Sequence, residues 1–389
     1  MLNINKPHAN KITELNMRIG VPKEIKNHEY RVGLTPAAVA ELVNNGHQVC
    51  VEDQAGVGVG FFNEDYEAAG ATILGTADAI FEAAELIVKV KEPQAVERAR
   101  LKPHHTLFTY LHLAPDVPQT NDLINSGATC IAYETVTDAH GRLPLLAPMS
   151  EVAGRMSIQA GARCLEKSME GRGMLLGGVP GVEPAKVVII GAGVVGQNAT
   201  AMAVGMGANV VVLDRSVDAL RKLDAQYGNR VRTVYSTALS IEQHVLSADL
   251  VIGGVLLPGA AAPKLITKAL VEKMKPGSVI VDVAIDQGGC AETAKATTHA
   301  EPTYIVDDVV HYCVANMPGA VARTSTLALN NATLPYVLQI ANKGARKALE
   351  DNPHLLEGLN VCKGIVTCES VAEAQNLAYK PAAEMVKEI

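Results

Sequence analysis

Short apolar runs alternate with amphipathic segments along most of this chain of 389 residues. In its first part, the runs at 18–21, 86–91 and 106–112 have the length and composition of buried strands, and segments such as 63–70 have a helical pattern. Strands that alternate with helices form a parallel sheet covered by helices on both faces. The first part of the chain therefore predicts such a sheet.

The same alternation returns in the second half of the chain. Strands are expected near residues 231–235, 248–253, 278–285 and 303–306, and beyond Pro318-Gly319 the pattern becomes mainly helical. A long helical segment, capped by Ser150 and reaching about residue 169, reads as the connector into this half. The fold class predicted is therefore α/β, with two doubly wound, Rossmann-like domains.

Residues 186–214 have the order of parts expected of a dinucleotide-binding unit. An apolar strand leads into GAGVVG, a small-residue helix follows, and a second apolar strand comes next. Gly191 permits the tight turn, Gly193 leaves room for a pyrophosphate beside the backbone, and Gly196 lets the helix pack closely on the sheet. The alternative is a glycine-rich turn that binds no ligand. With all the parts present and in order, we expect a bound dinucleotide.

Asp214 ends the second of these strands. An acid at this position accepts hydrogen bonds from the adenosine ribose and repels a 2′-phosphate, which favours NAD over NADP. Arg215 follows directly and could assist a 2′-phosphate, so the choice between the two cofactors stays open at this point.

Two candidate acid–base groups lie at expected strand ends, where ligands bind in open α/β sheets. His112 ends the strand at 106–112 and is suited to proton transfer near neutral pH. Asp286 ends the nearly continuous apolar strand before Gln287-Gly288-Gly289 and is expected to face the cofactor. The alternatives are a hydrogen-bonded core histidine and a helix-capping or loop acid.

Two cations are candidates for binding a substrate carboxylate. Lys91 ends a strand before Glu92-Pro93, and Arg31 follows a polar loop near the first strand. The planar guanidinium of arginine suits two-point recognition of a carboxylate. A solvent-facing lysine and a surface ion pair are the commoner uses of such residues.

The composition narrows the classes of partner. A net charge of −7 and the absence of a long basic run argue against nucleic acid as a ligand. The seven cysteines form no CxxC pair, and no histidine spacing indicates a metal site. Residues 1–16 form a polar extension without the apolar core of a signal peptide, and no apolar segment reaches membrane-spanning length. A soluble, cytoplasmic protein is expected.

Several sequence blocks, in order, carry a resemblance to a known family. They are RIGVPKEIK (18–26), EYRV (29–32), VKVKEP (88–93), YLHLA (110–114), PMSEVAG (148–154), the GAGVVG loop, VDVAIDQGG (281–289) and VANMPG (314–319). From Met17 to about Ala382 the chain resembles the alanine dehydrogenases, whose family includes the nicotinamide-binding subunit of proton-translocating transhydrogenase.

The resemblance implies a reversible, NAD-dependent oxidative deamination of L-alanine to pyruvate and ammonia. Arg31 and Lys91 would bind the substrate, and His112 and Asp286 would be the catalytic groups. The NAD contacts it implies come from Ser150, Gly191, Gly193, Val194, Val195, Gly196, Asp214, Ser236, Val255, Leu256, Val283, Ala284, Ile285, Asp286, Lys295, Val314, Ala315, Asn316 and Met317.

The resemblance also implies an organisation of the chain. A substrate domain would span residues 17–147, an NAD-binding domain 148–320, and the C-terminal helices at 321–389 would return to the substrate domain. The assembly would be a homohexamer. Some members carry a metal pair in the C-terminal helix, but here the equivalent region offers Gln339 and Lys343, so no metal is expected.

Other functions stay open at this point. One is a soluble transhydrogenase subunit that works through a membrane partner, although its relatives tend to lack the histidine found here as His112. A second is a related amino-acid or opine-type dehydrogenase, and a third is an NAD-binding protein without catalysis. The joint presence of Arg31, Lys91, His112 and Asp286 argues against the third.

Overall fold

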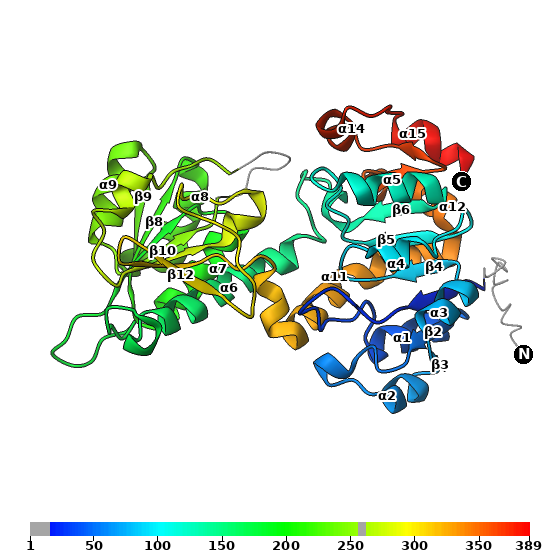
Figure 1. Cartoon of the computed structure of the whole chain (residues 1–389), viewed down its shortest axis with the longest axis horizontal. Helices are drawn as coiled ribbons and strands as arrows, with labels where there is room; N and C mark the ends of the chain where they lie inside the picture. Colours follow the sequence, from blue (N-terminus) through cyan, green and yellow to red (C-terminus); the bar gives the residue numbers. More distant parts are fainter. Residues whose placement is uncertain (1–15, 256–261) are drawn as a thin grey trace, which may run out of the picture. The chain divides into compact units, whose positions relative to one another are not determined.

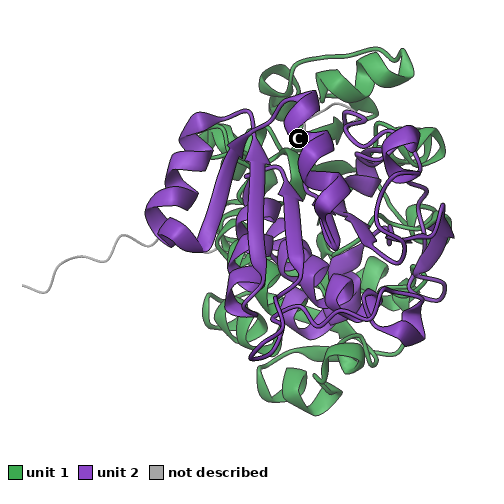
Figure 2. Ribbon diagram, turned by 90° about the vertical axis from the view of Figure 1, so that its left-hand side faces the viewer, with its two compact units in different colours: residues 1–146, 326–389 green, residues 147–325 purple. Residues whose placement is uncertain are grey.

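In the computed structural model, which describes residues 16–255 and 262–389, the chain divides into two units (Figures 1 and 2). Unit 1 consists of the chain up to Leu146 together with Thr326–Ile389, and unit 2 consists of Ala147–Ser325. Apart from Asn16, the polar extension expected at residues 1–16 lies outside the described residues.

Unit 1 is built on an eight-stranded sheet with the order β15-β14-β6-β5-β4-β1-β2-β3. Its first six strands pair in parallel, and β14 and β15 add an antiparallel edge. The strands are β1 (Arg18–Val21), β2 (Gln48–Glu52), β3 (Thr72–Leu74), β4 (Leu86–Val88), β5 (Thr106–Thr109), β6 (Thr129–Ala132), β14 (Leu359–Cys362) and β15 (Ile365–Val366).

The helices of unit 1 begin where the sequence supplies caps. Thr35, Thr76 and Asp116 accept a backbone N–H at the starts of α1, α3 and α5. The α-helices are α1 (Pro36–Asn44), α2 (Asn63–Ala68), α3 (Ala77–Ala83), α4 (Ala95–Arg98), α5 (Val117–Ser126), α12 (Ala345–Asp351), α13 (Pro353–Leu356), α14 (Glu369–Gln375) and α15 (Ala382–Met385). Helix α11 (Ala322–Lys343) begins in unit 2 and enters unit 1 at Thr326.

Unit 2 contains a seven-stranded sheet with the order β12-β13-β11-β10-β7-β8-β9, in which only β12 pairs antiparallel among the described strands. Its elements are α6 (Ala147–Cys164), β7 (Lys186–Ile190), α7 (Val194–Gly205), β8 (Asn209–Asp214), α8 (Val217–Tyr227), β9 (Val231–Tyr235), α9 (Ala238–Ser247), β10 (Leu250–Gly253), α10 (Lys268–Val271), β11 (Val279–Asp282), β12 (Thr303–Val306) and β13 (Val309–Tyr312).

The prediction of two doubly wound α/β sheets is confirmed. In unit 2 the parallel strands follow the Rossmann order, in which the chain starts in the middle at β7, moves outward to β9, and then crosses back to β10. The first six strands of unit 1 have the same order about β1. The reversal of direction lies between β1 and β4 in one sheet and between β7 and β10 in the other.

Alternate side chains of the unit 2 strands enter two apolar clusters. Val187 and Ile189 of β7 belong to one cluster, and Val188 and Ile190 belong to the other. Successive strand residues point to opposite faces, so helices cover both sides of this sheet. The continuous apolar runs of the sequence are explained by this double burial.

The C-terminal segment is mainly helical, as expected, but it also contributes β14 and β15 to the sheet of unit 1. Other local expectations were wrong. Ser150 does not cap a helix but lies inside α6, which starts at Ala147. The expected strands at 106–112 and 278–285 end earlier, at Thr109 and Asp282.

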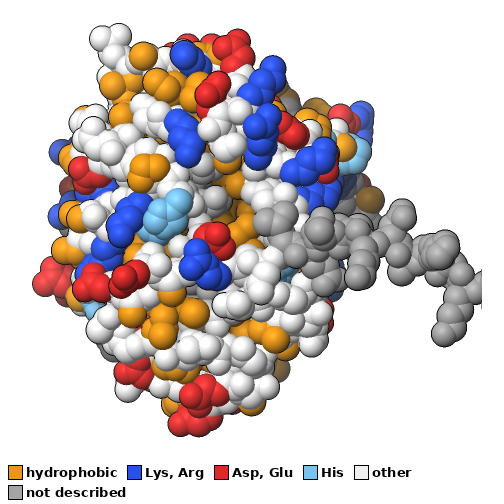
Figure 3. All heavy atoms as spheres, turned by 90° about the vertical axis from the view of Figure 1, so that its right-hand side faces the viewer, with side chains coloured by type: hydrophobic (Ala, Val, Ile, Leu, Met, Phe, Trp, Pro, Cys, Tyr) orange, Lys and Arg blue, Asp and Glu red, His pale blue; other side chains and the backbone are white. Residues whose placement is uncertain are grey.

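The surface carries charges of both signs. On the face drawn in Figure 3, Lys and Arg side chains are interspersed with Asp and Glu and with apolar side chains. Among the helices described, none combines the length and hydropathy needed to cross a membrane.

Candidate active site

The strand order of unit 1 brings several loops to one edge of its sheet. Strands β1, β4, β5 and β6 are parallel, so the segments that follow them leave at the same carboxyl edge. These segments contain the predicted residues Arg31, Lys91 and His112. The same edge holds acidic side chains that the sequence did not single out.

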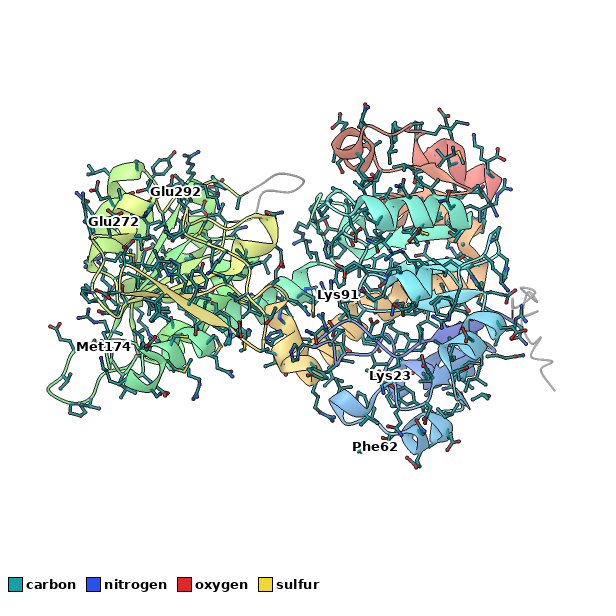
Figure 4. All side chains as sticks on the ribbon, viewed as in Figure 1. Lys23, Phe62, Lys91, Met174, Glu272 and Glu292 are labelled. Carbon is teal, nitrogen blue, oxygen red and sulfur yellow. The ribbon has the colours of Figure 1, made fainter. Side chains whose placement is uncertain are left out.

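Four charged or titratable side chains gather there, and Figure 4 marks one of them, Lys91. The Glu92 carboxylate lies 3.6 Å from Lys91 Nζ and 3.9 Å from His112 Nε2. Glu134 Oε1 lies 3.8 Å from His112 Nδ1. The imidazole thus has a carboxylate near each of its nitrogens, while its side chain stays 41% exposed.

Glu92 also accepts a hydrogen bond of 2.8 Å from Lys26 Nζ. Burial by itself raises the pKa of Glu92, but the charges of Lys91, His112 and Lys26 lower it to about 2. Glu92 is therefore a carboxylate throughout the neutral range and counterbalances three cations or potential cations.

Glu134 fixes the backbone that carries His112. It lies on the 3₁₀ turn η2 (Tyr133–Thr135) after β6 and accepts the N–H groups of His112, at 2.6 Å, and of Leu111, at 3.2 Å. His112 has a φ of +47°, a left-handed conformation that is unfavourable for residues other than glycine. Glu134 helps to hold this conformation, and the Tyr110 ring stacks on the imidazole at 5.6 Å.

Arg31 is not a surface arginine. It is buried and pairs with Glu29 through two bonds, Nε to Oε1 at 2.7 Å and Nη2 to Oε2 at 2.6 Å. Burial lowers the pKa of Arg31, but the contacts with Glu29 raise it by more, so the guanidinium keeps its charge. The sequence placed Arg31 in the site but did not identify Glu29 as its partner.

A buried ion cluster is centred on Lys89, two residues before Lys91, and was missed by sequence reasoning. Lys89 Nζ is 3.1 Å from Glu24 Oε2 and 2.7 Å from Glu97 Oε1. The other oxygen of Glu24 accepts the Val90 N–H at 2.7 Å. Glu24 therefore fastens the loop after β1 to the segment that presents Lys91. The sequence block 18–26, which contains Glu24, was recognised, but the contact between Glu24 and the segment of Lys91 was not.

In unit 2, the sheet register brings the predicted cofactor residues to one edge. Ile190 pairs with Leu213 and with Gly253, and Gly253 pairs with Asp282. The loops that begin at Gly191, after Asp214 and after Gly253 therefore leave the sheet side by side.

The glycine loop has the conformation that its sequence requires. Gly191 has a φ of +105°, and a Cβ there would lie 2.8 Å from the oxygen of Gly254. A Cβ at Gly196 would lie 1.8 Å from the oxygen of Gly191, so only glycine allows α7 to pack so closely. A Cβ at Gly193 would meet no atom within 4 Å. Space is thus open at Gly193, where the helix starts without a side-chain cap, as a pyrophosphate site needs.

Asp214 is tied to this loop. Its Oδ2 accepts the Ala192 N–H at 2.5 Å, and its Oδ1 accepts the Ser216 N–H at 2.6 Å. The backbone of Ser236, at the end of the next strand, bonds to the Asp214 carbonyl at 2.9 Å. Asp214 thus orders the loop, and its half-buried carboxylate remains at the edge where a ribose would lie.

The remaining cofactor residues lie at several places in unit 2. Val283, Ala284, Ile285 and Asp286 form the 3₁₀ turn η5 (Val283–Gln287) after β11, and the side chain of Asp286 is exposed. The segment Val314, Ala315, Asn316 and Met317 follows β13 and leads into η6 (Met317–Val321). Val255 follows β10 and is half-buried, whereas Leu256 lies outside the described residues.

Lys295 and Ser150 lie outside the strand ends. The ammonium of Lys295 lies 4.4 Å from the centre of the Tyr304 ring. Ser150 lies one helical turn before Gly154 of α6, and a Cβ at Gly154 would come within 2.3 Å of the Val195 oxygen. Helix α6 thus packs against the start of α7, and Ser150 belongs to the adjoining turn. Val194 and Val195 form the first turn of α7.

No group of three histidine, cysteine or acidic side chains within the described ranges is arranged to hold a metal ion. Lys343 instead pairs with Asp351 at 2.8 Å, and Gln339 bonds to Asn352 at 3.1 Å.

Comparison with known proteins places this geometry in a family. The model of the alanine dehydrogenase/PNT N-terminal domain matches residues 20–153, and that of the C-terminal domain matches residues 157–369. The chain belongs to this family. The side chains gathered at the carboxyl ends of the strands in unit 1 and in unit 2 therefore belong to a member of this family.

Relatives match over nearly the whole chain. The alanine dehydrogenase of Halomonas elongata is 62% identical over 370 residues, which cover 95% of this chain and 100% of that protein. The alanine dehydrogenase of Bacillus subtilis is 55% identical over 373 residues, covering 96% and 98%.

Solved structures share the fold. An L-alanine dehydrogenase superposes with a TM-score of 0.90 at 53% identity, covering 92% of this chain and 99% of the other. A transhydrogenase from Sinorhizobium meliloti superposes with a TM-score of 0.78 at 25% identity, covering 90% and 99%. This family resemblance, inferred from sequence blocks, is confirmed.

Proposed function

We propose that this chain catalyses the reversible, NAD-dependent oxidative deamination of L-alanine to pyruvate and ammonia. As a family member it is an amino-acid dehydrogenase that uses a nicotinamide cofactor and acts on small molecules. The observation that carries the proposal is the cluster of Lys91, Glu92, His112 and Glu134 at the strand ends of unit 1. A binding protein without catalysis would need no histidine held between two carboxylates.

The two units have separate tasks in this proposal. Unit 1 is the substrate domain and unit 2 is the NAD-binding domain, with residues 326–389 returning to unit 1. The ligand edge of each sheet lies at the carboxyl ends of its parallel strands, as the strand order requires.

Lys91 and Arg31 bind the substrate in unit 1. The Lys91 ammonium lies 3.6 Å from Glu92, which is longer than a hydrogen bond, so it can orient toward a substrate carboxylate or carbonyl. Arg31 is held rigid by Glu29, and in this proposal its guanidinium contacts the substrate carboxylate. Fixed positive charges orient the substrate before any bond changes.

His112 is the acid–base group. Hydride leaves the Cα of alanine only when the amine is neutral, so a base must first accept a proton from the substrate ammonium. Histidine is the side chain best suited to exchange protons near neutral pH, and Glu92 and Glu134 lie beside the two nitrogens of this ring and orient it. The same group then exchanges protons as water adds to the imine carbon and ammonia departs.

Unit 2 binds the cofactor, which supplies the hydride acceptor of the reaction. The residues we assign to it are those of the glycine loop, Asp214 and Ser236, the strand-end segments 283–286 and 314–317, and Ser150, Val255 and Lys295. Asp286, exposed on η5, is the second catalytic group. The carboxylate of Asp214 favours NAD, because a 2′-phosphate placed next to it would be repelled.

Homo-oligomerisation, as a hexamer, completes the proposal. It is supported by a loop of unit 2 that follows Met174, the residue labelled at the lower left of Figure 4. Its side chains Leu175, Val179 and Val182 are 66%, 53% and 62% exposed, and Val179 and Val182 form a small antiparallel bridge. Apolar side chains so exposed on one loop suit burial against another copy of the chain.

The test is a steady-state assay in both directions. L-alanine with NAD should form NADH, and pyruvate with ammonium should consume it. NADP should give much lower kcat/KM, and glycine and serine serve as substrate controls. Tight NADH binding without turnover of any amino acid would contradict the proposal and favour a transhydrogenase-like role.

A further inference from the structure

Asp282, the last residue of β11, is a buried acid that no part of the proposed reaction uses. The residue has no exposed surface, and its Oδ2 accepts two backbone N–H groups, Cys290 at 2.8 Å and Ala291 at 3.0 Å. One carboxylate oxygen therefore joins the end of the strand to the chain eight residues further on. The segment between Asp282 and Cys290, residues 283–289, is the turn that contains Asp286.

The geometry of this turn depends on the carboxylate. Gly288 and Gly289 have φ values of +91° and +78°, and a Cβ at Gly289 would lie 2.8 Å from Asp282 Oδ2. On the outer side, Lys264 Nζ bonds to the carbonyls of Gly288, at 2.5 Å, and of Ala291, at 3.1 Å. The returning half of the turn is held from inside by Asp282 and from outside by Lys264. Glu292, the next residue along the chain, is labelled in Figure 4.

Keeping an acid here has an energetic cost. Asp282 Oδ1 is buried and accepts no N–H among the residues described, and the side-chain donor beside the carboxylate is the thiol of Cys290, a weak one. Burial raises the pKa of Asp282, against the lowering effect of the two N–H groups. A neutral side chain would carry less desolvation penalty, but a carboxylate holds backbone N–H groups more strongly. The two N–H bonds to Oδ2 therefore offset the cost of burying the carboxylate, and they are the bonds that close the turn.

We propose that Asp282 is a positioning residue for Asp286: its carboxylate closes the turn from Val283 to Gly289 and thereby fixes where the exposed Asp286 side chain stands. The inference rests on the catalytic role proposed for Asp286. Asp282 itself touches neither substrate nor cofactor, and acts only through the turn.

The experiment compares Asp282→Asn, Asp286→Asn and the double variant in the full-length protein. Asp282→Asn should lower kcat about 10- to 100-fold, because small displacements of a reacting group have effects of that size. The KM for L-alanine should change less than about twofold, since Arg31 and Lys91 belong to unit 1. Adding Asp282→Asn to Asp286→Asn should lower kcat no further, because the group that Asp282 positions is already disabled.

Two further variants separate positioning from general damage. Asp249→Asn also removes a buried carboxylate of unit 2, one that pairs with Lys275 at 3.0 Å at the opposite end of the sheet. It should lower Tm but leave kcat unchanged. Lys264→Met removes the outer hold on the turn from an exposed position, and should lower kcat in the same direction even if Asp282→Asn folds poorly.

The outcomes are distinguishable. A kcat of Asp282→Asn equal to that of the wild type, or an undiminished further loss in the Asp286→Asn background, would overturn the inference while leaving the proposed function intact. Absence of alanine turnover in the wild type would instead refute the proposed function. Amide hydrogen exchange at Cys290 and Ala291 would then still show whether Asp282 closes the turn, because unchanged exchange in Asp282→Asn would refute the closure as well.

Discussion

At the scale of single residues, the proposed chemistry centres on His112 and its two carboxylates. The ring nitrogens face Glu92 at 3.9 Å and Glu134 at 3.8 Å, and Glu134 also binds the backbone N–H of His112. These contacts orient the imidazole. A histidine so placed can both accept and return a proton during one turnover.

Replacing this histidine tests its role. His112→Ala should reduce kcat by about 100-fold or more, the size of a general acid–base contribution, while the NADH dissociation constant changes less than about threefold. Steady-state kinetics and NADH fluorescence titration measure the two quantities. His140→Ala, at an exposed position, is the matched control. Turnover retained in His112→Ala would refute the assignment.

Glu92 gives a prediction for the pH dependence of stability. Its pKa is about 2 in the folded protein and near its ordinary 4.5 in the unfolded chain. Because the folded value is lower, the stabilisation is present above pH 4.5 and is lost as the pH falls toward 2. The full amount is about 3 kcal/mol, and about 1.4 kcal/mol is lost by pH 3.5.

Glu92→Gln should therefore be less stable than the wild type at pH 7, and the difference should narrow as the pH falls from 5 to 3.5. Urea unfolding at each pH measures it. Glu64→Gln, on the exposed side of α2, should follow the wild type in parallel. A gap between Glu92→Gln and wild type that stays constant down to pH 3.5 would contradict the ion-pair account.

Sequence reasoning at this scale selected residues by type and strand-end position, and so placed Arg31, Lys91 and His112 at one edge. It did not select Glu134, although Glu134 follows β6 as His112 follows β5, and the same rule could have found it. A rule based on residue type and strand-end position could not have selected Glu29 and Glu24. Their roles arise from contacts with a buried guanidinium and with a segment 66 residues away.

At the scale of elements, the same change, glycine to alanine, should have different effects at two positions where the glycine loop meets α7. Gly193→Ala should fold with unchanged Tm, since its Cβ meets no protein atom, but should weaken NADH binding about tenfold or more by filling the open space at the helix start. Gly196→Ala should lower Tm markedly, because its Cβ would overlap the Gly191 oxygen.

Thermal unfolding and NADH titration measure both effects. Gly205→Ala, at the other end of α7 with open space around it, is the control for any effect of alanine on the helix. NADH affinity unchanged in Gly193→Ala would argue against a pyrophosphate at this loop.

The elements themselves were largely predictable, because double burial leaves continuous apolar runs and capping residues mark helix starts. Strand ends were not. Apolar character continues past Thr109 and Asp282 into loops that pack inside the unit, where the chain leaves the hydrogen-bond ladder. The hairpin of β14 and β15 was missed, although Lys363-Gly364, both with positive φ, is a recognisable turn signal.

At the scale of the whole molecule, the protein consists of two units, each built on a Rossmann-type sheet. The exposed apolar loop with Leu175, Val179 and Val182 leads us to expect burial against other copies. Light scattering should give a mass about six times the 41.0 kDa of one chain. The variant with Leu175→Ser and Val182→Ser should shift toward smaller species, and a monomeric wild type would contradict the expectation.

The order of strands in each sheet was within reach of the sequence, since parallel α/β topology allows few arrangements. That topology also determines that the loops after the parallel strands leave each sheet at the same carboxyl edge. The addition of residues 359–366 to the sheet of unit 1 does not follow from it, because short strands pair with whichever edge the completed fold presents.

The central claim is that hydride passes from the Cα of L-alanine to the nicotinamide of NAD. L-alanine deuterated at Cα tests this directly, with the reduced cofactor analysed by mass spectrometry after turnover. The account predicts NADH that carries one deuterium per molecule, formed together with pyruvate and ammonia. Unlabelled NADH, or pyruvate formed without reduced cofactor, would contradict it.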